Sequence, residues 1–259
     1  MEQNMRLASL TALLWIAGAF GCSTECPEAA DPSAAPAPAT AGDETSDGHA
    51  EPGHAHVDRT HGHQPGHRGH RFEDPEDWED HFEGSDRDAW QKPQAVLDLL
   101  DLEPDHIVAD VGTGTGYFAA KLVERVPEGR VWAVDIEPGM VRHVNARARE
   151  QNLGNLFAVL GKPDDPLLPE PVDLVLVVDT YHHIEDRTAY FENLRSHLRP
   201  GGRVAIVDFE MGDIPVGPPE EMKIAPDRVK QELEDAGYTL VTDDRYTLPH
   251  QYILIASPK

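Results

Sequence analysis

The sequence has 259 residues, enough for one ordinary domain plus extensions. Its 47 acidic and 22 basic side chains give a formal net charge of −25 at pH 7, which argues against nucleic acid as a partner, because a DNA or RNA binder needs a basic surface to neutralise phosphates. Only two cysteines occur, Cys22 and Cys26, so the body of the chain has neither a disulfide framework nor a cysteine zinc site.

Residues 1–21 are typical of a signal peptide. Arg6 precedes an uncharged apolar run over residues 7–20, which is too short to span a bilayer comfortably. The letters AFGC at the end of this run resemble a bacterial lipoprotein box, although leucine is usual where Ala19 stands. The resemblance implies a lipid on Cys22 and a location in the cell envelope, at the outer membrane because serine follows the cysteine. Ordinary secretion, or a cytoplasmic protein whose signal is not functional, remain alternatives.

Residues 22–71 form a linker that is rich in proline, alanine and histidine. The segment has almost no large apolar residues, so we expect a disordered tether between membrane and domain. Seven histidines lie in it: His49, His54, His56, His61, His63, His67 and His70. Neutral imidazoles on a flexible chain bind zinc, nickel or copper loosely, so loose divalent metal binding and a plain polar spacer are both open. No metal site with fixed ligands is predicted.

From residue 72 to residue 259, apolar runs typical of strands alternate with amphipathic helices. The expected strands are residues 106–110, 130–135, 156–161, 172–179, 203–209, 238–246 and 250–257. The expected helices are residues 94–102, 115–126, 138–151, 186–198 and 227–236. Such alternation predicts a doubly wound, Rossmann-like α/β domain with a mostly parallel seven-stranded sheet. The last two strands lie too close in sequence for a crossover helix, so we expect an antiparallel final strand.

A glycine-rich segment, DVGTGTG, joins the first expected strand to the next helix. Glycines let the backbone approach a ligand closely, and ligands bind at the carboxyl edge of such sheets. A dinucleotide fingerprint needs glycine where Tyr117 stands, which disfavours a nucleotide oxidoreductase. The pattern DxGxGxG resembles motif I of class I S-adenosylmethionine (SAM)-dependent methyltransferases. The resemblance implies that Asp110, Gly112, Gly114 and Gly116 bind SAM.

Further residues stand where that family has its cofactor contacts. Asp135 ends the second strand, where the resemblance implies an acid that holds both ribose hydroxyls. Ile136 and Met140 follow at positions that line the adenine. Asp164 and Asp165 come after the third strand, where an acid accepts from the adenine amino group, and the choice between the two stays open.

The segments VDLVLVVDTYHHI and LRPGGRVAIVDF resemble the fourth motif and the fifth strand of the family. The resemblance runs from about residue 86 to residue 259. RDAWQKP, DTYHHI, VGPP and LPHQYILIA resemble segments of a bacterial group of such methyltransferases.

Four polar residues just past the fourth strand are the catalytic candidates: Asp179, Tyr181, His182 and His183. One histidine can take a proton from an acceptor hydroxyl, or one carboxylate can orient an amine. We expect methyl transfer from SAM to an unidentified acceptor, a small molecule. The alternative is a non-catalytic SAM- or metal-binding lipoprotein module on the same fold, because SAM is made in the cytoplasm while the chain carries an export signal.

Overall fold

The computed structural model describes residue 84 and residues 86–259. The predicted signal peptide, the predicted lipid anchor at Cys22, the linker and its histidines all lie outside these described residues. Within the described part, no helix combines the length and the apolar character that a membrane crossing requires.

The described residues form a seven-stranded sheet with helices between its strands. The strands are β1 (Ile107–Val111), β2 (Arg130–Asp135), β3 (Leu156–Leu160), β4 (Val172–Val178), β5 (Leu198–Phe209), β6 (Tyr238–Asp244) and β7 (Gln251–Pro258). The α-helices are α2 (Arg87–Gln91), α3 (Pro93–Leu99), α4 (Tyr117–Arg125), α5 (Pro138–Glu150), α6 (Arg187–Leu194) and α7 (Pro226–Asp235). Three short 3₁₀ turns are η1 (Tyr181–His183), η2 (Arg195–His197) and η3 (Glu220–Met222).

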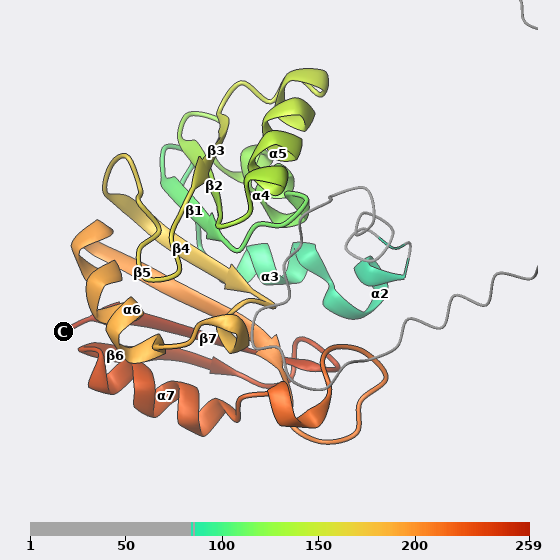
Figure 1. Cartoon of the computed structure of the whole chain (residues 1–259), viewed down its shortest axis with the longest axis vertical. Helices are drawn as coiled ribbons and strands as arrows, with labels where there is room; N and C mark the ends of the chain where they lie inside the picture. The colour runs from blue at the N-terminus through green and yellow to red at the C-terminus, as the bar shows by residue number, and fades with distance from the viewer. Residues whose placement is uncertain (1–83, 85) are drawn as a thin grey trace, which may run out of the picture. The chain divides into compact units, whose positions relative to one another are not determined.

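The strand order is β3-β2-β1-β4-β5-β7-β6 (Figure 1). The pairs among β1 to β5 are parallel, while β7 runs antiparallel to both of its neighbours, β5 and β6. This topology confirms the predicted mostly parallel sheet with an antiparallel final strand. The strand order reverses between β1 and β4, so the carboxyl ends of these two strands flank the position where such sheets bind ligands.

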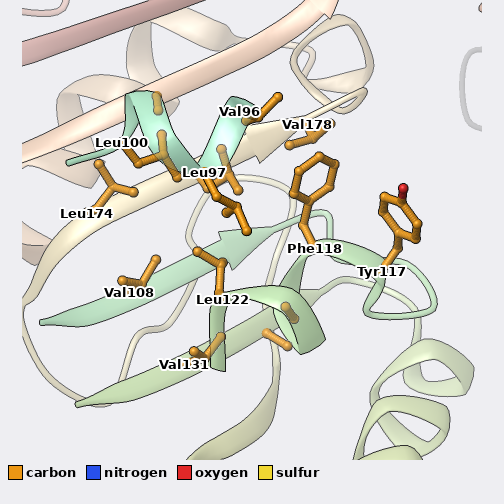
Figure 2. Close-up of a cluster of buried hydrophobic side chains, with 14 of the residues drawn as sticks. Val96, Leu97, Leu100, Val108, Tyr117, Phe118, Leu122, Val131, Leu174 and Val178 are labelled. Atoms are coloured by element: carbon orange, nitrogen blue, oxygen red, sulfur yellow. The ribbon is translucent and has the colours of Figure 1, made fainter. Parts of the chain in front are cut away.

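Each face of the sheet is covered by its own apolar layer. On one face, α3 and α4 pack on alternate residues of β1, β2 and β4, and Figure 2 shows Leu97, Leu122 and Leu174 in this cluster. On the other face, α6 and α7 cover the intervening residues, among them Val175 and Val177. The strands therefore read as continuous apolar runs because both faces of the sheet are buried.

Several element boundaries differ from the prediction. Helix α4 begins at Tyr117 instead of residue 115, because Gly116 takes a left-handed φ of 85° that no α-helix contains. The helix expected over 186–198 ends at Leu194 and continues as a 3₁₀ turn. Strand β5 already begins at Leu198, and the five-residue helix α2 was not predicted from the sequence.

Leu122→Ala tests how much the apolar layer between α3, α4 and the sheet contributes to stability. The Leu122 side chain is fully buried between α3, α4 and the sheet, so we expect the free energy of unfolding to fall by about 2–5 kcal/mol. Urea unfolding followed by circular dichroism measures the loss. Met211→Ala, at a residue that is 42 % exposed, is the control and should change stability by about 0.5 kcal/mol or less. Equal effects of the two substitutions would contradict this layer arrangement.

Candidate functional site

The glycine loop after β1 has a backbone path that requires glycine. Gly112, Gly114 and Gly116 have φ values of 73°, 56° and 85°. The amides of Gly112 and Thr113 both donate to the carbonyl oxygen of Val134, at 2.9 and 3.0 Å, so the loop is tied to the end of β2. A Cβ on Gly112 would lie 2.2 Å from Oγ1 of Thr180, which no real contact allows. The loop therefore lies close against the segment after β4, at the carboxyl edge of the sheet.

Asp110, near the end of β1, stabilises this loop through a hydrogen bond. The carboxyl group is buried and accepts a hydrogen bond of 2.8 Å from the Thr113 hydroxyl. Burial raises the pKa of Asp110 to about 6, although the Thr113 hydrogen bond opposes the rise. The structure places this side chain against the loop, which its hydrogen bond stabilises. The contact of Asp110 with SAM stays a prediction.

Asp135 joins the end of β2 to the glycine loop. One carboxylate oxygen accepts from the Gly114 amide and the other from the Glu137 amide, both at 2.9 Å. Burial raises the pKa of this carboxyl, which is 9 % exposed, and the two amides partly oppose that rise. Each carboxylate oxygen has a second lone pair, so the group can still accept two hydroxyl hydrogens. These are the acceptors that a ribose diol requires, and the residues present therefore fit an adenosyl group.

The four residues predicted beside the adenine differ in their exposure to solvent. Ile136 is 53 % exposed beside Asp135, whereas Met140 is 1 % exposed and packs inside the domain. The Asp165 carboxylate accepts from the Leu167 amide at 2.8 Å and lies 3.2 Å from Nε2 of His197. Asp164 is exposed, so of the two acids it is the one whose carboxylate faces solvent.

A partly buried polar cluster surrounds Asp179 directly after β4. Its carboxylate accepts from Arg87 at 3.3 Å and from Gln91 at 3.0 Å, both on α2, and also from Gln251 at the start of β7. Gln91 further donates to Gln251 at 3.0 Å. Burial raises the pKa of Asp179, the Arg87 charge lowers it, and the nearby Asp208 raises it again. Asp179 has a left-handed φ of 53°, which indicates that the cluster holds it against its backbone preference.

Sequence reasoning did not single out the partners of Asp179. Arg87, Gln91 and Gln251 belong to the segments RDAWQKP and LPHQYILIA, whose resemblance to one bacterial group was visible. The structure brings these segments together with DTYHHI at the carboxyl edge. Their shared feature is therefore this polar cluster, whose members are up to 160 residues apart in sequence.

Tyr181 is a core residue and does not belong to the polar site at the carboxyl edge of the sheet. Its side chain is fully buried in the apolar layer on the α6 and α7 face of the sheet, here called the second apolar layer. Its hydroxyl donates to Glu232 on α7 at 2.7 Å. Arg187 holds the same carboxylate through two hydrogen bonds, at 2.6 and 3.0 Å. Burial and the Glu232 carboxylate raise the pKa of the Tyr181 phenol. The expectation of a catalytic Tyr181 is therefore replaced by a structural role.

His182 forms a pair with Asp208, the last residue but one of β5. Nδ1 of His182 lies 2.9 and 3.1 Å from the two carboxylate oxygens of Asp208, and the His182 amide donates to the same group at 3.2 Å. The His183 ring is exposed and lies 4.2 Å from the His182 ring, centroid to centroid. Sequence reasoning missed Asp208, although an acid near the end of the apolar run RVAIVDF was a usable signal.

Asp110→Asn should flatten the pH dependence of stability. The folded-state pKa of about 6 exceeds the ordinary value of 3.8, so the stability that Asp110 contributes is present at low pH and is lost as pH rises through 6. Between pH 5 and pH 7 the wild-type protein should lose about 1 kcal/mol more than the variant. Parallel unfolding free energies of the two proteins across this range would contradict a buried, proton-retaining Asp110.

Comparisons with known proteins agree with this geometry. Residues 108–202 match the family model described as a methyltransferase domain. The chain is 33 % identical over 129 residues to a malonyl-[acyl-carrier protein] O-methyltransferase of Acetivibrio thermocellus, covering 47 % of this chain and 44 % of the relative. It is 35 % identical over 138 residues to the nocamycin O-methyltransferase of Saccharothrix syringae, covering 52 % and 47 %. The chain thus spans less than half the length of these curated relatives.

A solved structure covers more of the chain. The SAM-dependent methyltransferase of Aquifex aeolicus superposes with a TM-score of 0.65 at 25 % identity, over 71 % of this chain and 97 % of that chain. Fold and family model point to the same cofactor, SAM. Residues 108–202 therefore match a methyltransferase domain, and the described residues have the fold of the SAM-dependent methyltransferases.

Proposed function

We propose that this protein transfers a methyl group from SAM to a small-molecule acceptor. The observation that carries the proposal is the position of Asp135, whose carboxylate joins the glycine loop to the end of β2 and keeps two lone pairs for a ribose. When bound, SAM supplies a methyl group on a positively charged sulfur, so the protein has to position an acceptor behind that methyl and exclude water.

The adenosyl part of SAM is assigned to the β1–β2–β3 side of the carboxyl edge. Asp135 accepts from the ribose hydroxyls, and the exposed Ile136 packs on the adenine. The solvent-facing carboxylate of Asp164 accepts from the adenine amino group, whereas Asp165 is held by Leu167 and His197. Gly112 and Gly114 have no side chains, so the backbone of the loop can approach the cofactor closely.

The methionine part of SAM is assigned to the other side of the glycine loop. A methionine end carries an ammonium and a carboxylate, and the Arg87–Asp179 ion pair offers one charge of each sign next to Thr180, which contacts Gly112. Helix α2 supplies Arg87, so this helix would cover the bound cofactor. Exchange of the ion pair for contacts with the ligand avoids leaving a buried charge unpaired.

The acceptor is assigned to a small molecule because of the chemistry of the relatives. One curated relative is a nocamycin O-methyltransferase, and another, from Triticum aestivum, is a phosphoethanolamine N-methyltransferase. The acidic balance of the chain disfavours a nucleic acid as acceptor.

We also propose that the domain is attached to the cell envelope through lipid on Cys22, with the histidine tract as a tether that binds divalent metal loosely. The support is the sequence of residues 1–71 alone. Mass analysis of the N-terminus of the native protein tests the anchor: a lipidated Cys22 is expected, and an intact Met1 would overturn it.

Asp135→Asn should weaken SAM binding about 10- to 100-fold, because the variant replaces a doubly accepting carboxylate by an amide whose NH₂ faces the Gly114 amide. Isothermal titration calorimetry with SAM measures the change, and thermal unfolding verifies that the variant is folded. Glu137→Gln removes a neighbouring charge and leaves the Glu137 amide in place, so its affinity should stay within about twofold of wild type. No SAM binding by the folded wild-type chain would overturn the proposed function.

A further inference from the structure

The His182–Asp208 pair orients one histidine nitrogen and leaves the other available. Asp208 is fully buried, and its carboxylate also accepts from the Phe209 amide at 2.8 Å, so it cannot rotate away without losing that bond. With Nδ1 of His182 at 2.9 Å from this carboxylate, the ring proton of the neutral imidazole lies on Nδ1. Nε2 is then the nitrogen with a free lone pair.

Nothing in the described part of the protein occupies that lone pair. Among the contacts of residues 86–259, His182 bonds through its amide and Nδ1 only, and no hydrogen bond involves Nε2. The side chain is 3 % exposed, yet Nε2 does not belong to the buried atoms of the described residues that lack a partner. A small exposed surface on an otherwise enclosed ring therefore lies at Nε2.

The charges around the ring favour proton uptake. Burial lowers the pKa of His182, but the hydrogen bond and charge of Asp208 and the charge of Asp179 raise it, while Arg187 on α6 lowers it; the net direction is upward. His183, whose ring is tilted against that of His182 with the centroids 4.2 Å apart, is another titratable group at the ring. An imidazole in this setting accepts a proton at near-neutral pH and is stabilised by Asp208 once it is charged.

We infer that His182 is the general base of this methyltransferase, that Asp208 is its positioning residue, and that the acceptor carries its proton on oxygen, as a phenolic or enolic hydroxyl. The inference rests on the proposed function and adds the substrate class. A neutral amine needs no base before it attacks, whereas a hydroxyl is a poor nucleophile until its proton leaves.

The reaction is balanced with the groups present. The acceptor oxygen forms a bond to the methyl carbon while the sulfur–methyl bond breaks, and that electron pair stays on sulfur. The hydroxyl proton passes to Nε2 of His182. The imidazolium ion, paired with the Asp208 carboxylate, then returns the proton to water.

The test uses the full-length chain, methyl-labelled SAM and a matched pair of probes, 3,4-dihydroxybenzoate and 3,4-diaminobenzoate. We expect label in the dihydroxy acid and none in the diamino acid. His182→Asn should lower kcat about 100-fold or more, with the dissociation constant for SAM unchanged within about twofold. His182→Gly with added imidazole should recover turnover, which a purely structural histidine would not allow.

The pH profile separates base from positioning residue. In the wild type, kcat/KM should fall below a pKa above 6.5, because the protonated imidazole cannot accept a proton. Asp208→Asn should lower kcat and move this limb to lower pH, since the charge that raises the His182 pKa is gone. His106→Asn, at a histidine near the amino end of β1 that accepts from the Glu103 amide, is the control and should leave the profile unchanged.

Three results would overturn the inference: equal labelling of both probes, no labelling of the dihydroxy acid by a chain that binds SAM, or a His182→Asn rate within about twofold of wild type. Failure of the proposed function is distinguishable, because it appears as a wild-type chain that does not bind SAM in calorimetry.

Discussion

The contact on which the site depends is the hydrogen bond between the Gly114 amide and the Asp135 carboxylate. It joins the loop after β1 to the end of β2, and the second oxygen of the same carboxylate fixes the Glu137 amide at the start of α5. One side chain thus holds three segments in a common geometry. A buried carboxylate is stable there because the two amides satisfy it, so the shape of the loop depends on this one side chain.

A second constraint acts at the other side of the loop. Arg87, Gln91 and Gln251 surround Asp179, and every one of these polar groups is satisfied by another member of the cluster. Burying such groups costs free energy unless all are paired, so the cluster links α2, β4 and β7 in one arrangement. A short helix of five residues that would not be stable alone is held over the carboxyl edge in this way.

The 3₁₀ turn after β4 places two adjacent side chains in different surroundings. Tyr181 points into the second apolar layer and anchors the turn on α7 through Glu232. His182, the next residue, bonds to Asp208 on β5. The neighbouring side chains diverge, so the core contact of one fixes the position of the other. The turn is therefore fixed by two contacts, that of Tyr181 with Glu232 and that of His182 with Asp208.

The local pattern of the sequence was sufficient for the alternation of strands and helices, the antiparallel end of the sheet, the glycine loop and the acid at the end of β2, because strand burial and glycine conformation are encoded within a few residues. Only the tertiary structure decided that Tyr181 packs in the core while His182 pairs with Asp208, and that Asp165 is held by Leu167 and His197. It also decided that Gln91 and Gln251, 160 residues apart, meet around Asp179. Those outcomes depend on packing between distant segments, where no periodicity in the sequence records the partner.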